Sequence, residues 1–228
     1  HEELPLDRQQ PYPFFLASPL EAAVETLGPV SDWLLEWKWD GIRLQLLRRQ
    51  GEVALWSRGE ERLDGRFPEI EQAAAALPDG CVIDGELLVG GTSRTNAPTR
   101  TFSDLQQRLN RKTVTAKMLE DYPVFIRAYD ILFDGDVDVR PETFLTRRER
   151  LSALVARQEP RRFDLSPLVS FSTWEELEQL RAELARLLRA AGLPNSARAA
   201  WVPVHRLTSA AGPDNGEPGL ALQSSLSA

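Results

Sequence analysis

The sequence predicts an α+β domain, because strand patterns and helical patterns follow each other without the even spacing of repeated βαβ units. Strands are expected from alternating apolar residues at 33–39, 42–49, 53–58, 81–89, 123–133 and 168–172. Helices are expected from apolar residues at helical spacing at 67–77, 102–109, 116–122, 143–157 and 174–190. A short turn around Gly51 joins two of the strands, which favours antiparallel pairing.

Composition narrows the class of protein. The chain has 228 residues, of which 42% are hydrophobic and 27% charged, so it can bury a core. No apolar run approaches the ~18 residues of a membrane-spanning helix, and the first residues lack the pattern of a secretory signal. Cys81 is the single cysteine, which excludes an intramolecular disulfide and a cysteine-based metal cluster. We therefore expect a cytoplasmic protein that has no membrane partner and is a monomer.

The periodic patterns divide the chain into three parts. Residues 1–28 are rich in proline and predict a lead-in or linker. Residues 29–190 carry the strands and helices, and Thr173 with Glu176 forms a capping box that predicts the start of the last helix. Residues 191–228 hold only four residues of Asp, Glu, Lys or Arg and show no sustained period. This tail is expected to be disordered or misread.

The predicted strand at 33–39 has two faces, because alternate residues of a strand point to opposite sides. One face is apolar, with Trp33, Leu35, Trp37 and Trp39. The other carries Glu36, Lys38 and Asp40. A second strand places two carboxylates, Asp84 and Glu86, on one face. Such carboxylates are costly if they are buried without partners, but they suit a cleft that binds a metal or a ribose.

The net charge of −7 is negative, so the overall charge of the chain does not favour electrostatic binding to the DNA backbone. Residues 94–117 nevertheless form a basic strip with a net charge of +5: Arg94, Arg100, Arg108, Arg111, Lys112 and Lys117 against Asp104. This strip is either a solvated helix face or a surface that contacts a DNA backbone.

Four short motifs follow one another in a recognisable order. Residues 38–43 read K-W-D-G-I-R, which has the form K-x-D-G-x-R; S-R-G follows at 57–59, D-G-E-L at 84–87 and A-Y-D at 128–130. The order resembles that of covalent nucleotidyltransferases, the superfamily of ATP-dependent DNA ligases, RNA ligases and mRNA capping enzymes. Two further segments are similar to bacterial ATP-dependent DNA ligases: P-Y-P-F-F-L-A at 11–17 and F-S-D-L-Q-Q-R at 102–108. The resemblance covers residues 11–190.

The resemblance implies an adenylation domain of antiparallel sheets flanked by helices. It also implies that a lysine attacks the α-phosphate of ATP with help from Mg²⁺. AMP then passes to the 5′-phosphate of nicked double-stranded DNA, and the 3′-hydroxyl displaces it. By position, Lys38 matches the adenylated nucleophile, and Glu36 matches the residue that recognises the adenine edge. Tyr129 stands where the family places an aromatic ring on adenine, usually phenylalanine.

Three further positions match phosphate, ribose and metal ligands of the family. Arg43 and Arg58 match arginines near the ribose, the nucleotide phosphate and the nick, and Glu86 matches the acidic residue at the ribose and the metal. Other readings remain open. Arg58 also fits a surface cation paired with Glu60 or Glu61, Tyr129 a core aromatic, Asp40 a brace of the turn, and Cys81 a small buried hydrophobic residue.

The family's later motifs are not found after residue 190. A ligase is expected to continue with a strand of the form E-G followed by three apolar residues and a lysine, and then with a lysine-bearing strand; here no lysine follows Lys117. The resemblance therefore implies a chain that is incomplete at its C-terminus and seals nicks poorly. The alternatives are an RNA ligase or capping-type enzyme, and a catalytically dead remnant that binds nucleotide or DNA.

Overall fold

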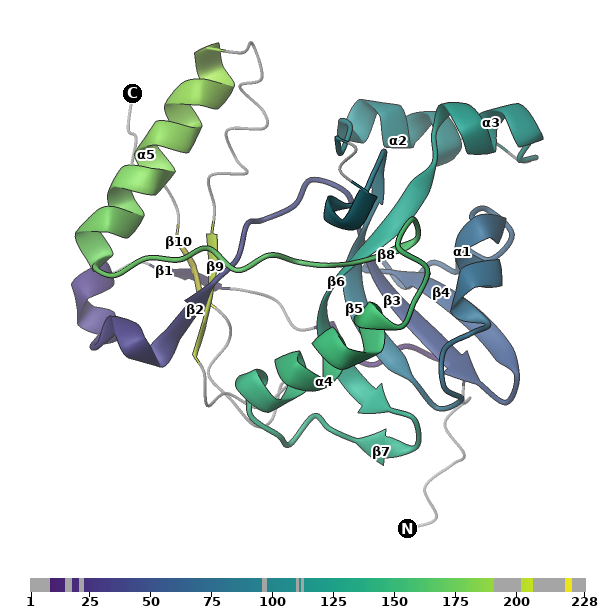
Figure 1. Ribbon diagram of the computed structural model, residues 1–228, viewed down its shortest axis with the longest axis horizontal. Helices are drawn as coiled ribbons and strands as arrows, with labels where there is room; N and C mark the ends of the chain where they lie inside the picture. The colour runs from purple at the N-terminus through teal and green to yellow at the C-terminus, as the bar shows by residue number, and fades with distance from the viewer. Residues whose placement is uncertain are drawn as a thin grey trace. The chain divides into compact units, whose positions relative to one another are not determined.

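The computed structural model describes residues 9–14, 18–20, 23–95, 98–109, 111, 113–190, 202–206 and 220–222 (Figure 1). The chain divides into two compact units. The first holds His1–Phe14, Gly41–Glu142 and Thr146–Leu165, and the second holds Phe15–Asp40, Thr143–Leu145 and Ser166–Ala228. Strands and helices mix in both units, which confirms the predicted α+β class.

The first unit is built on a sheet whose strands are mainly antiparallel. Its strands are β3 (Ile42–Arg49), β4 (Glu52–Ser57), β5 (Val82–Val89), β6 (Val124–Asp134), β7 (Val137–Asp138) and β8 (Phe163–Leu165). The order is β4-β3-β5-β6-β7, and β8 pairs with β6 in parallel. The expected bounds of β3 agree with the structure. Those of β5 differ by one residue at its start, and those of β4 and β6 differ by one residue at both ends.

Helices cover one face of this sheet. They are α1 (Pro68–Ala74), α2 (Phe102–Leu109) and α4 (Phe144–Ala156). A short η3 turn lies at Ser93–Thr95, and α3 (Ala116–Asp121) contributes no buried residue. The core joins Leu44 and Leu46 of β3 and Ile83 of β5 to Ile70 of α1 and Leu154 of α4. Because side chains alternate along a strand, the residues between these core positions face the other side of the sheet.

The turn between β3 and β4 is fixed by a carboxylate from another segment. Gln50 and Gly51 have φ angles of 53° and 81°, as a tight two-residue hairpin requires. Asp79 accepts hydrogen bonds from both backbone N–H groups at 2.9 Å and from Arg48 Nη1 at 2.9 Å. The N–H of Gly51 is the main cause that lowers the pKa of the Asp79 carboxyl.

The basic strip at 94–117 does not form one surface. Arg94 donates to backbone oxygens at the end of α4, and Arg100 Nη1 donates to the carbonyl of Asp121 at the end of α3. Arg108 is fully buried and contacts both carboxylate oxygens of Glu69 at 2.7 and 3.0 Å. The strip is therefore not one solvated face, because Arg108 is buried, whereas the other described cations of the strip are exposed. Lys112 lies outside the described residues.

The second unit has its own small core. Its elements are η1 (Val24–Leu27), η2 (Val30–Asp32), β1 (Ser18–Leu20), β2 (Trp33–Leu35), α5 (Trp174–Ala190), β9 (Val202–Arg206) and β10 (Leu220–Leu222). Trp33, Leu35 and Trp174 pack together, and the indole N–H groups of Trp33 and Trp174 donate to the carbonyls of Leu27 and Gly28. The start of α5 keeps half of the expected capping box, since Thr173 Oγ1 accepts from the N–H of Glu176. The Glu176 carboxylate accepts from Ser172 instead of Thr173.

Two expected strands are wrong in part. The strand expected at 33–39 ends at Leu35, followed by an isolated bridge between Glu36 and Leu168. The strand expected at 168–172 is absent from the described residues apart from that bridge. The pairing of the two segments stops at a proline. Val169 N donates to Leu35 O, and the next donor in the same pattern would be the backbone N–H of residue 167. Residue 167 is a proline and has no N–H.

The sequence predicts an irregular tail, and the structure differs in two short segments of it. Within residues 191–228, the described strand β9 pairs with β2, and β10 pairs with β9 and β1. Valine at 202 and 204 favours a strand, and Pro203 is tolerated because pairing with β2 begins only at Val204. The rest of the tail lies outside the described residues. None of the described helices is both long and apolar enough to pass through a bilayer.

The thiol of Cys81 should not react in the folded protein. The residue is fully buried, and burial raises the pKa of the thiol to about 12, so little reactive thiolate forms at neutral pH. We expect an aromatic disulfide reagent to detect no thiol in native protein and one per chain in denaturant. Rapid reaction of native protein would show that this core opens readily.

Candidate active site

The face of the first sheet away from the helices carries polar side chains centred on Arg43. Arg43 of β3 lies opposite Glu86 of β5 in the antiparallel register. Its guanidinium carbon lies 5.7 Å from the ring centre of Phe14 and 5.6 Å from that of Tyr129. The nearest oxygen of Asp84 is 3.9 Å from Arg43 Nη2. One cation is therefore held between two aromatic rings beside a pair of carboxylates.

Burial sets the protonation of these groups. It raises the pKa of Asp84 to about 6, although Arg43 and a hydrogen bond from Gln45 act in the opposite direction. Burial also raises the pKa of Tyr129 well above its ordinary value, so its phenol is neutral. Burial tends to lower the pKa of Arg43, but Tyr129, Asp84 and Glu86 outweigh it, and the pKa is raised. Arg43 is thus a permanent cation at this face.

The guanidinium of Arg43 has hydrogen-bonding capacity left over. Its Nε is buried and has no hydrogen-bond partner within the described part of the chain. A buried donor of this kind is costly unless a ligand supplies an acceptor. An anionic oxygen of a phosphate, or a ribose hydroxyl, fits that requirement.

Glycines of two motifs let the chain pack closely around Glu86. The N–H of Gly41 donates to Glu86 Oε1 at 3.2 Å. A Cβ added at Gly41 would lie 2.3 Å from the carbonyl oxygen of Leu87, and one at Gly85 would lie 2.8 Å from Ile126 Cγ2. Both distances are shorter than real Cβ contacts. The glycine of K-x-D-G is therefore required by the approach of this turn to β5.

Arg58 is exposed on the turn after β4, and its backbone N–H donates to the carbonyl of Arg43 at 3.2 Å. The surface pairing considered from sequence finds no support, because Glu61 pairs with Arg66 at 2.6 Å. No ion pair of Arg58 occurs within the described residues. The turn is thus attached to β3, and the Arg58 charge remains available to a ligand.

Lys38 and Glu36 belong to the second unit, whereas Arg43, Arg58, Glu86 and Tyr129 belong to the first. Lys38 and Asp40 are exposed, on a segment without regular secondary structure. Glu36 is only 3% exposed, so it does not share an open strand face with Lys38 as the alternation predicts. The difference follows from the end of the ladder at Glu36, after which the alternation of a strand no longer applies.

Sequence reasoning missed Gln45, which is fully buried on β3 two residues after Arg43. Gln45 Nε2 donates to Asp84 Oδ1 at 2.9 Å, and Gln45 Oε1 accepts from the N–H of Tyr12 at 2.6 Å. Trp56 Nε1 also donates to Gln9 O at 2.7 Å. Residues 9–14, expected as a lead-in, are therefore bound to the sheet beside Arg43. A glutamine among leucines of a strand was the available signal.

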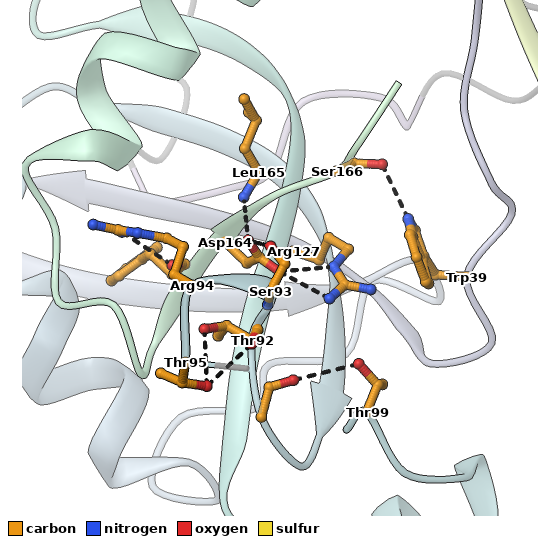
Figure 2. A network of polar contacts seen from close by, with 12 residues as sticks. Trp39, Thr92, Ser93, Arg94, Thr95, Thr99, Arg127, Asp164, Leu165 and Ser166 are labelled. Carbon is orange, nitrogen blue, oxygen red and sulfur yellow. Dashed lines mark hydrogen bonds and ion pairs between the residues drawn. The ribbon is translucent and has the colours of Figure 1, made fainter. Parts of the chain in front are cut away.

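A second missed group anchors the strand that carries Tyr129. Asp164 of β8 accepts from Arg127 Nε and Nη2 at 3.1 and 2.8 Å, and from the N–H and hydroxyl of Ser93 at 3.0 and 2.6 Å (Figure 2). Burial tends to raise the pKa of Asp164, but these hydrogen bonds outweigh it and the pKa is lowered. The ion pair of Asp164 with Arg127 anchors β6 to β8, and all four contacts of Asp164 lie inside the first unit.

Comparison with known proteins identifies the family. The family model described as the ATP dependent DNA ligase domain matches residues 14–186. The chain belongs to this family. It is 30% identical over 194 residues to a probable DNA ligase of Koribacter versatilis, and 39% identical over 132 residues to DNA ligase C2 of Mycolicibacterium smegmatis. The matches cover 82% and 57% of this chain but only 33% and 36% of those proteins, so the chain spans about a third of their length.

Solved ligase structures share the fold of this chain. A mycobacterial DNA ligase D complexed with ATP and MES is 21% identical with a TM-score of 0.62, covering 96% of this chain and 62% of that one. A Lig E DNA ligase is 16% identical with a TM-score of 0.58, covering 92% and 70%. These likenesses confirm the expected nucleotidyltransferase fold of DNA ligase adenylation domains.

Substituting Gly41 with alanine should destabilise the first unit. The added Cβ collides with the backbone of Leu87. Overpacking of this kind typically lowers the free energy of unfolding by about 1–3 kcal/mol. Gly59→Ala is the matched control, because a Cβ there meets only Ser57 Oγ at 3.9 Å. Denaturant unfolding should show a lower midpoint for Gly41→Ala alone. Equal midpoints for the two variants would contradict the packing at this turn.

Proposed function

We propose that this chain is part of an ATP-dependent DNA ligase and carries its nucleotide-transfer chemistry. In this proposal the amine of Lys38 accepts AMP from ATP, and the AMP passes to the 5′-phosphate of nicked double-stranded DNA. The carrying observation is Arg43: a permanent cation with a buried, unpartnered Nε, five residues after the lysine of a K-x-D-G-x-R motif. Family membership supports the same chemistry.

The first step is a displacement at the α-phosphate. The Nζ–P bond forms, the bond from the α-phosphorus to the pyrophosphate oxygen breaks, and the amine loses a proton. A lysine amine with a reference pKa near ~10.4 is mostly protonated at neutral pH, so nearby positive charge is needed to favour its neutral form. The exposure of Lys38 leaves its amine accessible to the nucleotide.

Arg43 would bind ribose or phosphate oxygens and stabilise the charge that develops on them. Tyr129 would stack on adenine, and its ring centre lies 5.6 Å from the guanidinium carbon of Arg43. Glu86 would contact the ribose, and Glu36 the adenine edge. Arg58, on the turn tied to Arg43, would contact the phosphate of the nucleotide or of the nick.

Mg²⁺ fits the carboxylates present. Asp84 and Glu86 lie two residues apart on β5, and burial makes the charged form of Asp84 costly, a cost that a cation would relieve. No group of three or more metal-binding side chains occurs in the described residues. Mg²⁺ commonly uses one or two carboxylates with phosphate oxygens and waters, so Glu86 with a nucleotide suffices. The ion supplies neutralisation of the pyrophosphate charge.

Nicked double-stranded DNA remains the proposed polynucleotide, and a cytoplasmic monomer the expected form. Two relatives carry the name DNA ligase, which favours DNA over RNA as the strand that is joined. The strip at 94–117 does not contribute a continuous DNA surface, because Arg94 and Arg108 are engaged within the protein. DNA contacts are therefore expected around Arg58 and the exposed lysine segment.

The nucleotide should attach to Lys38 and to no other lysine. With α-labelled ATP and Mg²⁺, denatured wild-type protein should retain label, and Lys38→Ala should abolish it. Lys38→Arg should also abolish it, because a guanidinium stays protonated. Lys117→Ala is the control, since Lys117 is exposed and pairs with Asp121 on α3. Label that persists on Lys38→Ala would contradict the proposal.

Glu86→Gln should impair nucleotide use without unfolding the protein. Glutamine keeps an oxygen that can accept from Gly41 N–H but loses the negative charge. We expect labelling to fall at least tenfold, while the free energy of unfolding changes by less than about 1 kcal/mol. Parallel measurements of labelling and denaturant unfolding separate the two effects. A collapse in stability would show that Glu86 is a structural partner only.

A further inference from the structure

We propose that Ser166 is a positioning residue for Lys38 and acts through the indole of Trp39. The inference rests on the nucleophilic role proposed for Lys38 and adds the group that fixes its segment. Trp39 Nε1 donates to Ser166 Oγ at 3.0 Å (Figure 2). Both residues belong to the second unit, as Lys38 does.

The need for such a contact follows from the end of the backbone ladder. Residues 35 and 36 pair with 169 and 168, through Val169 N to Leu35 O and the bridge of Glu36 with Leu168. Continued pairing would place residue 37 opposite Pro167, which has no N–H to donate. The segment that carries Lys38 therefore leaves the ladder one residue before the lysine is reached.

The indole contact replaces the missing backbone pairing on the far side of Lys38. Ser166 lies one residue before Pro167, and Trp39 lies two residues after Trp37. Their side-chain hydrogen bond therefore joins the same two segments again beyond the proline. Ser166 is only 1% exposed, which protects that bond from competing water. Lys38 is thus the exposed residue between two fixed points, Glu36 and Trp39.

Fixing both neighbours matters because displacement at phosphorus needs the nucleophile close to the reacting atom and in line with the leaving group. A lysine side chain has several freely rotating bonds, and a mobile backbone would add further disorder. The contact should therefore affect the rate of lysyl-AMP formation more than the binding of ATP. Ser166 touches no reacting atom, so its role is positioning.

The test uses the full chain with Ser166→Ala, Trp39→Phe and the double variant. Each single variant should lower the rate of lysyl-AMP formation at saturating ATP about tenfold, and the half-saturating ATP concentration should change less than about twofold. The double variant should be no slower than either single variant, because both remove the same bond. Ser166→Thr, which keeps a hydroxyl, should retain most of the rate.

Trp174→Phe is the matched control. It also removes an indole donor from the second unit, the one that binds Gly28 O at 2.9 Å, but its bond lies outside the lysine segment. Labelling by this variant should be unchanged. Additive losses in the double variant, or an equal loss in Trp174→Phe, would overturn the positioning role.

Hydrogen exchange gives a readout that needs no nucleotide. Backbone amides of residues 37–40 should exchange faster in Ser166→Ala and Trp39→Phe than in wild type or Trp174→Phe. Unchanged exchange would overturn the inference even if labelling falls. Wild-type protein that takes no label would overturn the proposed function, and exchange would then decide alone whether Ser166 holds the segment.

Discussion

The alternation of side chains along β3 and β5 is the constraint on which the rest of the first unit depends. Leu44, Leu46 and Ile83 enter the core, so Arg43 and Asp84 must face the opposite side. A slip of one residue in register would place the charges in the core and the leucines at the site. The same pairing that builds the hydrophobic core therefore also places Arg43 and Asp84 on the polar face, and segments outside the strands, such as Phe14, complete it.

Arginine pairing distinguishes that face from the supporting structure. Arg108 with Glu69 and Arg127 with Asp164 are buried pairs with closest distances of 2.7 and 2.8 Å. At the polar face, by contrast, Arg43 lies 3.9 Å from its nearest carboxylate. Short, shared hydrogen bonds stabilise a charge locally, whereas an incompletely paired charge is available to a ligand. The difference marks Arg43 as a binding group on geometric grounds.

The sequence predicted local features well and features that depend on distant partners poorly. The bounds of β3, α2 and α5 agree with their periodicity, and the glycine of the lysine motif meets a real close contact at Leu87. The basic strip misled because charge along the chain does not reveal partners such as Glu69, which lies 39 residues before Arg108. The strand expected at 33–39 failed because its partner segment contains a proline, and the register that brings Pro167 opposite residue 37 is not readable from either segment alone.

Pro167 determines both the accessibility and the orientation of the segment that carries Lys38. A Lys38 held in a paired strand would have a fixed backbone, but neighbouring strands would crowd the approach of a nucleotide to its amine. A Lys38 in an unrestrained loop would be accessible and poorly oriented. Ending the ladder at Glu36 exposes the lysine, and the buried bond from Trp39 to Ser166 restores order immediately beyond it. The second unit thus combines access with orientation over the four residues from Glu36 to Trp39.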